Sequence, residues 1–184
     1  ADRSELRIKR AWNQNATSGT KPSGYNYGAE YTTSTAILNA LTDDRSESHG
    51  THVAGIAAGA DKANSNIYYG IATDADLVMV SYNYEDGSYD NVSILDGIKY
   101  IYNYADNAGK PCVINMSLGT HNGPHDGTST FDRLCDQLQG EGKLLIGSAG
   151  NEGADNFHVS KNFTSADNTL KTFFYFTDKT DLYG

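Results

Sequence analysis

A histidine at the head of a helical pattern is the strongest chemical signal in the sequence. Residues 48–58 carry His49 near their start, and apolar Val53, Ile56 and Ala57 follow at helical spacing among small residues. Small residues on several faces allow a helix to lie against neighbouring backbone, so the pattern predicts a buried helix with His49 in its first turn. The positive end of the helix dipole disfavours a charged imidazolium, which would keep His49 available as a neutral general base.

Two other segments carry residues suited to holding a substrate and a developing negative charge. Ser117, Leu118 and Gly119 end an apolar strand, where their backbone could pair with an extended peptide by strand addition. Asn151 follows another apolar strand at its carboxyl end, where open parallel sheets place ligands, and its amide could donate to an oxyanion. Taken alone, the first segment is an ordinary strand end and Asn151 an ordinary turn residue.

The three segments resemble, in the same order, sequence blocks of the subtilisin-like serine proteases (subtilases). The matching blocks are residues 49–55 (HGTHVAG), 113–119 (VINMSLG) and 150–153 (GNEG). The resemblance implies that His49 is the catalytic base and Asn151 the oxyanion donor. It also implies a substrate-binding role for four residues: Ser117, Leu118, Gly119 and Gly150.

The family resemblance further implies a serine endopeptidase that cleaves protein or peptide substrates through a Ser-His-Asp triad. It leads us to expect a bacterial protein that is secreted or held at the cell envelope. No cofactor is expected, apart from structural calcium in the loop at Asp61, Asn64 and Asn66, where some relatives bind it. His49 and His52 share a helical face, but no third ligand accompanies them, so we expect no metal site there.

The other two triad members have no clear match. The triplet Gly127-Thr128-Ser129 resembles the family's nucleophile block, but it precedes Asn151 instead of following it. Thr128 or Ser129 is better explained as the cap of the next helix. The family places the orienting Asp in an apolar strand, where Thr or Ser and then Gly follow it. Three aspartates before His49 lack this context: Asp2, Asp43 and Asp44.

We therefore interpret the chain as the central piece of a subtilase catalytic domain, inactive alone, with the Asp upstream and the Ser downstream. The missing remainder of the domain is then its first expected partner. The alternative is a non-catalytic module, a pseudoprotease or a processed fragment that serves as a scaffold or binding partner. A nucleotide-binding domain has little support, because no phosphate-binding loop follows any predicted strand.

The elements that would position these residues alternate in type. Strands are predicted at residues 77–80, 112–116 and 144–146, and amphipathic helices at 92–105 and 131–138. Such alternation indicates an α/β fold with a parallel sheet flanked by helices. Residues 1–31 show no periodicity and are expected to be irregular, with Trp12 as an anchor, and Thr33 or Ser34 should cap a short helix through Leu41.

The C-terminal segment changes character. Residues 161–164 and 169–176 mix Thr and aromatic residues and predict antiparallel strands joined through residues 165–168. We divide the chain into a partial catalytic domain, residues 1–157, and the beginning of a β-rich insert, residues 158–184. An incomplete sheet exposes its edges, so a homodimer formed through those edges is also expected.

Composition excludes two classes of partner. The chain has 184 residues and a formal net charge of -9, which argues against nucleic acid, because phosphate binding needs a basic face. It has no apolar run of membrane-spanning length, so no membrane partner is expected. The only cysteines, Cys112 and Cys135, fall on apolar positions of a strand and a helix and are predicted to be buried free thiols.

Overall fold

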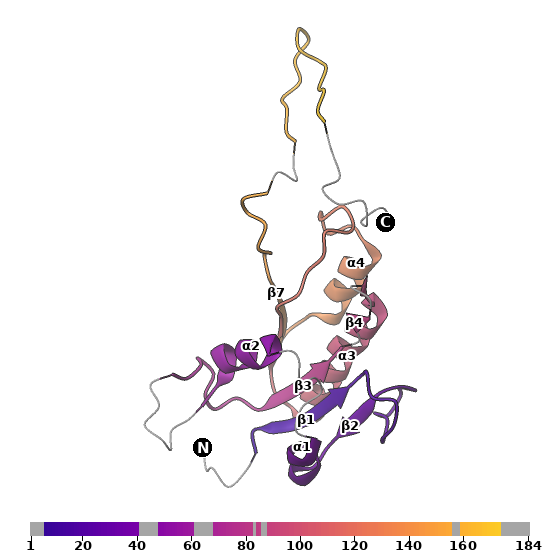
Figure 1. Ribbon diagram of the computed structural model, residues 1–184, viewed down its shortest axis with the longest axis vertical. Helices are drawn as coiled ribbons and strands as arrows, with labels where there is room; N and C mark the ends of the chain where they lie inside the picture. The colour runs from indigo at the N-terminus through magenta and orange to yellow at the C-terminus, as the bar shows by residue number, and fades with distance from the viewer. Residues whose placement is uncertain are drawn as a thin grey trace. The chain divides into compact units, whose positions relative to one another are not determined.

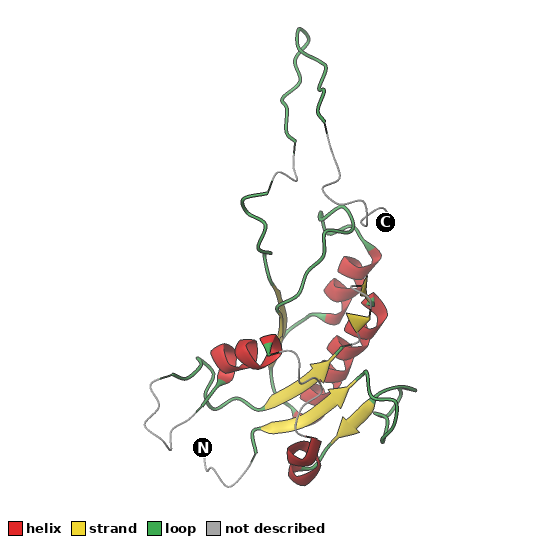
Figure 2. Ribbon diagram, viewed as in Figure 1, coloured by secondary structure: helices red, strands yellow, loops and turns green. Residues whose placement is uncertain are grey.

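The computed structural model describes residues 6–40, 48–60, 68–82, 84–85, 88–155 and 159–173. The chain divides into two compact units, residues 1–148 and 149–184. The first unit contains every helix and strand of the described residues, and the helices and strands are mixed as expected for an α/β fold (Figure 1, Figure 2).

The first sheet has three strands. β1 (Ile8–Asn13) lies in the middle, antiparallel to β2 (Ala29–Tyr31) and parallel to β3 (Leu77–Ser81). The expectation that residues 1–31 are irregular was therefore wrong for residues 8–13 and 29–31, and it holds for residues 14–28. Two adjacent cations, Lys9 and Arg10, hide any apolar alternation in β1, and pairing with the distant β3 holds it in place.

The second parallel pair carries the predicted strand and helix alternation. After β3 the chain forms α3 (Asn91–Ala108), β6 (Cys112–Met116), α4 (Thr130–Leu138) and β7 (Lys143–Gly147). β6 and β7 are parallel and in register from Cys112 opposite Lys143 to Met116 opposite Gly147. The order of these elements is confirmed, although the described strands form separate small sheets in place of one continuous sheet.

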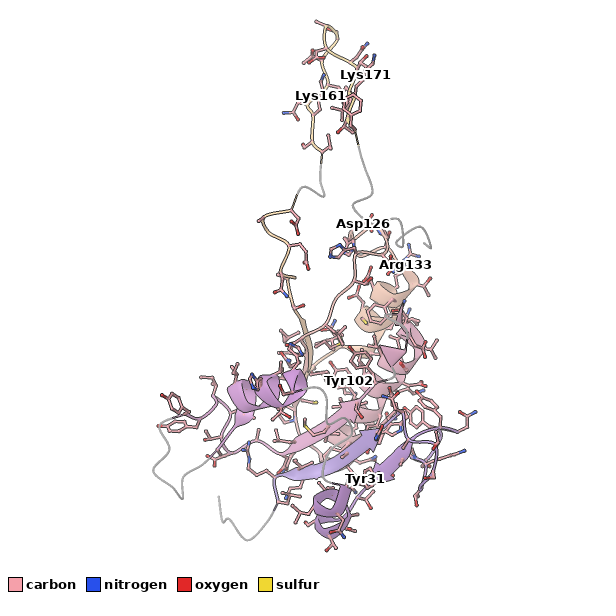
Figure 3. The ribbon with its side chains drawn as sticks, viewed as in Figure 1. Tyr31, Tyr102, Asp126, Arg133, Lys161 and Lys171 are labelled. Atoms are coloured by element: carbon pink, nitrogen blue, oxygen red, sulfur yellow. The ribbon has the colours of Figure 1, made fainter. Side chains whose placement is uncertain are left out.

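The core lies where α3 and α4 pack on one face of β6 (Figure 2). Its buried residues are Ile94, Ile98, Tyr102, Ile114 and Cys135. Figure 3 labels Tyr102 in this region, and the Lys143 ammonium lies 5.6 Å from its ring centroid. Burial raises the pKa of the Tyr102 phenol to about 12.

Local signals explain where α3 begins and ends. The Asp90 carboxylate accepts hydrogen bonds from the backbone N–H groups of Val92 (3.0 Å) and Ser93 (3.3 Å). Gly109 ends the helix in the left-handed region at φ 63°, a conformation that glycine adopts without steric cost. These caps fix the length of the helix that supports both the first sheet and the core.

A second apolar cluster forms around Trp12, which is only 1% exposed. The rings of Tyr25, Tyr27 and Tyr100 lie 4.6, 5.2 and 5.2 Å from it, centroid to centroid. The Tyr100 hydroxyl donates to Glu30 at 2.8 Å, and burial followed by this bond raises the pKa of Tyr100 above its usual range. The predicted Trp12 anchor is confirmed, and it ties β1 to α3.

Two shorter features complete the first unit. α1 (Ser34–Ala40) is capped by Thr33, whose hydroxyl accepts from the Ala36 N–H at 3.2 Å, as predicted. The predicted last helical residue, Leu41, lies outside the described residues. β4 (Tyr84–Glu85) and β5 (Ser88–Tyr89) form a small antiparallel pair before α3.

The second unit contains a chain reversal and, within residues 149–155 and 159–173, no strand. Thr164 and Asp167 exchange backbone hydrogen bonds of 3.0 and 3.3 Å, and the Lys161 ammonium contacts the Asp167 carboxylate at 2.6 Å. The predicted strands at 161–164 and 169–173 were wrong, and residues 174–176 lie outside the described range. Phe163 and Phe173 are exposed, so nothing described here gives two short strands an apolar face to pack on.

Candidate active site

His49 is the first residue of α2 (His49–Ala58), as the sequence predicted. The turn is closed by the His52 N–H, which donates to the Ser48 carbonyl at 3.0 Å, while the Ser48 side chain makes no capping bond. His49 and the rest of this first turn are exposed, so the imidazole is accessible. Accessibility at a helix N-terminus suits a base that must reach the proton of a nucleophile and then that of a leaving group.

The predicted burial of α2 was wrong. Ala58 is its one buried residue, and Ile56 is 75% exposed. The helix is contacted along its C-terminal half, where residues 70–72 run beside it. There Gly70, Ile71 and Ala72 donate backbone hydrogen bonds to carbonyls of residues 59, 56 and 57, at 2.8, 3.3 and 2.9 Å.

Ser117, Leu118 and Gly119 follow the last residue of β6, at its carboxyl end. The Ser117 hydroxyl accepts from the Asn115 side-chain amide at 3.0 Å. A Cβ added to Gly119 would meet only the Ser148 hydroxyl oxygen, at an ordinary 3.8 Å, so the backbone there is open on one side. Ser117 and Gly119 are exposed, as a segment that pairs with an extended peptide must be.

Ser148 is a supporting residue that sequence reasoning missed. Its N–H donates to the Met116 carbonyl at 3.1 Å and its hydroxyl donates to the Leu118 carbonyl at 3.0 Å. These bonds continue the β6 and β7 pairing beyond the strands and fix the backbone of the Ser117 segment. The only signal was its place two residues after the predicted strand at 144–146.

Asn151 lies in the second unit, at an exposed turn. Gly150 has φ 87°, and its backbone approaches the next carboxylate so closely that an added Cβ would lie 2.8 Å from Glu152 Oε2. The Asn151 N–H donates to that same oxygen at 2.8 Å. Glu152, which sequence reasoning did not single out, therefore helps to set the turn that carries Asn151.

The carboxyl end of β1 carries amides and no carboxylate. Gln14 is 5% exposed and donates from Nε2 to the Ser93 carbonyl at 2.8 Å, and Asn15 donates from Nδ2 to the Tyr82 carbonyl at 3.2 Å. Residues 13–29 contain no Asp or Glu. Three acidic residues considered earlier lie outside the described residues: Asp2, Asp43 and Asp44.

Ser129 is the N-cap of α4, as predicted. Its hydroxyl oxygen accepts from the Asp132 N–H at 3.1 Å, and the Asp132 carboxylate accepts from the Ser129 N–H at 3.3 Å. The hydroxyl also donates to Asp132 Oδ2 at 2.7 Å. This reciprocal capping box gives the Gly127-Thr128-Ser129 triplet a structural role.

The described residues give no group of three or more His, Cys, Asp or Glu side chains able to hold a metal ion. The proposed calcium loop, with Asp61, Asn64 and Asn66, lies outside them. Cys112 and Cys135 are free thiols, as predicted; Cys135 is buried, whereas Cys112 is only half-buried, and burial raises the pKa of Cys135 to about 11. Among the described helices, none combines the length and apolar character needed to cross a membrane.

Comparison with known proteins matches residues 15–172 to the model of the Subtilase family. Subtilisin from Bacillus sp. (strain TA39) is 36% identical over 124 residues, which cover 67% of this chain and 28% of that protein. Subtilisin-like protease 3 from the fungus Pseudogymnoascus destructans is 34% identical over 123 residues, covering 64% of this chain and 27% of that protein.

Among solved structures, the CspB protease of Clostridium perfringens superposes with a TM-score of 0.65 and 26% sequence identity, covering 80% of this chain and 32% of that one. The chain thus spans about a quarter to a third of the length of these relatives. Because both bacterial and fungal proteins match, a bacterial source stays a prediction.

Proposed function

Because the chain belongs to the subtilase family, we propose that the intact protein is a serine endopeptidase in which His49 is the general base. The observation that carries the proposal is the accessible His49 imidazole in the first turn of α2, within the first of three family blocks in family order. Protein or peptide chains are the proposed substrates.

In the proposed reaction, His49 takes the proton of a serine hydroxyl that attacks the scissile carbonyl. It then gives that proton to the leaving amine, and the acyl-enzyme is hydrolysed by water in the same way. An aspartate orients the imidazole. Neither the Ser nor the Asp is assigned to a residue of this chain, so the 184-residue chain alone is expected to be inactive.

The remaining roles fall on the backbone and on one amide. The segment of Ser117, Leu118 and Gly119, whose first and last residues are exposed at the end of β6, pairs with the substrate as an added strand, and a substrate-binding role for Gly150 follows from the family resemblance. Asn151 donates its side-chain amide to the tetrahedral oxyanion. Loss of such a donor in this family costs about 10²- to 10³-fold in kcat; the example from which that magnitude comes is subtilisin itself.

A serine-directed fluorophosphonate probe tests the proposal. The 184-residue chain should stay unlabelled, and the longest natural form should be labelled at one serine that follows Asn151. His49→Ala should abolish labelling, and Asn151→Ala should lower kcat by about 10²-fold or more. Asn122→Ala, an exposed asparagine outside the site, is the matched control. An unlabelled, inactive intact protein would contradict the proposal.

The non-catalytic alternative depends on the orienting carboxylate. No residue of this chain is assigned to that role, and the carboxyl end of β1, which precedes the His49 helix in the chain, holds Asn13, Gln14 and Asn15. If the intact protein has no other orienting carboxylate, we propose that it is a pseudoprotease that binds peptide segments without cleaving them. Retained binding of an extended peptide by an unlabelled protein would support this alternative.

The exposed face of the β6 and β7 pair supports a partner that covers it. Val113, Leu144 and Ile146 are 65%, 54% and 50% exposed. We propose that the remainder of the catalytic domain covers this face, and that a homodimer forms when it is absent. A monomer by light scattering at high concentration of the 184-residue chain would count against the dimer.

Location and domain division are further proposals. Secretion or retention at the cell envelope follows from the family resemblance, and fractionation of the source cells would test it. The proposed boundary between a catalytic part, 1–157, and an insert, 158–184, lies near the boundary of the two compact units at residue 148. Limited proteolysis should cut first between residues 148 and 160.

A further inference from the structure

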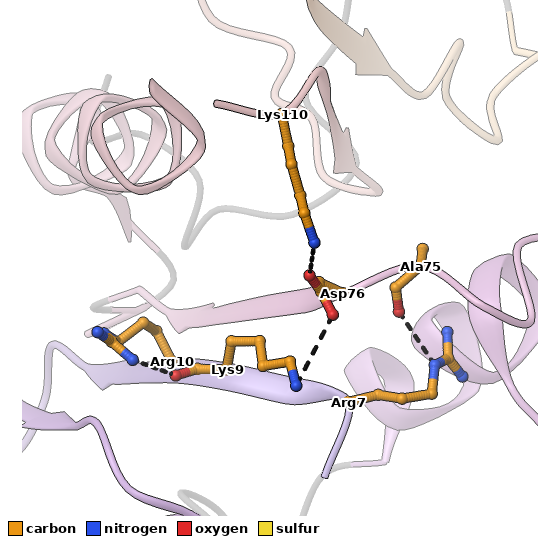
Figure 4. Close-up of polar contacts among 6 residues, drawn as sticks. All are labelled: Arg7, Lys9, Arg10, Ala75, Asp76 and Lys110. Carbon is orange, nitrogen blue, oxygen red and sulfur yellow. Dashed lines mark hydrogen bonds and ion pairs between the residues drawn. The ribbon is translucent and has the colours of Figure 1, made fainter. Parts of the chain in front are cut away.

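We propose that Arg7 is a positioning residue that sets the direction of the helix carrying His49, an inference that rests on the proposed role of His49 as base. Arg7 directly precedes β1, and its guanidinium reaches three backbone carbonyls. Nη1 donates to Ala58 at 2.6 Å, Nη2 to Ala72 at 2.8 Å and Nε to Ala75 at 3.0 Å. Figure 4 shows Arg7 at the start of β1 and its contact with Ala75.

The contact with Ala58 caps the C-terminal end of α2. Ala58 is the last residue of the helix, so its carbonyl has no partner within the helix. The C-terminal end of a helix also carries a partial negative charge, which a guanidinium neutralises. The planar Arg7 guanidinium therefore links the end of α2 to the segment that leads from residue 72 into β3.

Arg7 is itself fixed to the sheet. Its carbonyl accepts from the Leu77 N–H at 2.8 Å, which extends the parallel pairing of β1 with β3. The side chain thus transmits the position of the sheet directly to α2. A lysine at this place offers one ammonium in place of a fork and could not span all three carbonyls with the same geometry.

Geometry explains why this distant contact matters for His49. The other described contacts of α2 with residues 70–72 also lie in its C-terminal half. His49 precedes Ala58 by nine residues, which is about 13.5 Å along the helix axis at about 1.5 Å per residue. A tilt of about 5° at the anchored end would move His49 by about 1 Å, and a misplacement of that size can lower a catalytic rate by about 100-fold.

The first experiment uses the 184-residue chain and needs no activity. Backbone hydrogen exchange across α2 and the ring resonances of His49 are measured for the wild type, Arg7→Ala and Arg7→Lys. The matched control is Arg10→Ala. It removes the same charge three residues further on, within β1, and the Arg10 side chain contacts the Lys9 and Thr32 carbonyls instead of α2. We expect Arg7→Ala to speed exchange in α2 by about tenfold and to shift the His49 resonances, with Arg7→Lys intermediate and Arg10→Ala without effect.

The second experiment uses the longest natural form, with active sites counted by the fluorophosphonate probe. For each labelled site, Arg7→Ala should lower kcat by about 10- to 100-fold with KM within twofold, and Arg7→Lys should restore part of it. A purely structural role would reduce the number of active sites and leave kcat per site unchanged. If the wild type is inactive, the proposed function fails; if α2 exchange and His49 resonances are unaltered in Arg7→Ala, the Arg7 proposal fails, whatever the activity.

Discussion

Ser129→Ala separates a capping serine from a nucleophilic one. The substitution removes the hydroxyl that accepts from the Asp132 N–H and donates to the Asp132 carboxylate, while the backbone N–H of residue 129 can still donate to that carboxylate. Loss of an N-cap side chain costs about 0.5–2 kcal/mol. α4 is a nine-residue helix that buries Cys135 in the core, so we expect a free energy of unfolding lower by about 1–2 kcal/mol.

Thermal unfolding followed by circular dichroism measures this loss. For a chain of this size, about 1.5 kcal/mol corresponds to a fall in Tm of about 3–6 °C. Ser129→Thr, which keeps a hydroxyl cap, should stay within about 1–2 °C of the wild type, since threonine caps nearly as well as serine.

The same variants are treated with the fluorophosphonate probe. We expect neither the wild-type chain nor Ser129→Ala to react, because the hydroxyl is already engaged with Asp132. An unchanged Tm would refute the capping role. Labelling of the wild type that disappears in Ser129→Ala would show that Ser129 is a nucleophile and would overturn the assignment of the site.

Three further predictions follow from the packing and charges of the first unit. The hydrogen bond from Lys110 holds the pKa of Asp76 below its usual range, so the carboxylate's stabilisation is complete above about pH 4 and is lost as the pH falls through the lowered pKa. Asp76→Asn should therefore lower Tm at pH 6 and flatten its decline between pH 5 and 2.5. Cys135 should react with iodoacetamide at pH 8 far more slowly in the folded chain than in urea, because burial raises its pKa to about 11; equal rates would contradict this. Gly70→Ala should destabilise the contact with α2 by about 1–3 kcal/mol, because the new Cβ would lie 2.6 Å from the Gly55 carbonyl oxygen. The expected result is faster backbone hydrogen exchange in α2 and unchanged exchange elsewhere.

Elements with a local apolar period could be predicted from the sequence, and elements held by distant pairing could not. α3 and β6 have apolar residues at helical or strand spacing and clear caps, and both were predicted within a few residues. β1 contains Lys9 and Arg10, and its partner β3 lies about seventy positions later in the chain, so no local pattern announced it. For the aromatic segment at 161–173 the error was the reverse: strands were predicted and none is found. Its composition favours strands, but the described residues give it no apolar surface to pack on.

The candidate site shows the same distinction between local and distant information. The position of His49 at the first turn of α2 is encoded within a few residues, and it was predicted. The groups that hold this helix and the Ser117 segment in place were not predicted. Arg7 acts across about fifty residues, and Ser148 reaches Leu118 across about thirty. Neither contact leaves a sequence period that could be recognised without the fold.

The geometry of α2 also limits what the histidine block can say about activity. A Cβ added at Gly50 or Gly55 would meet nothing within 4 Å, whereas one added at Gly70 would clash with the backbone of Gly55, Ala58 and Gly59. The docking of the helix end therefore requires a small residue at position 70 and does not explain the glycines of the block. Catalysis depends in addition on a carboxylate and a serine that must meet His49 from other segments. The response of the intact protein to the fluorophosphonate probe decides between protease and pseudoprotease.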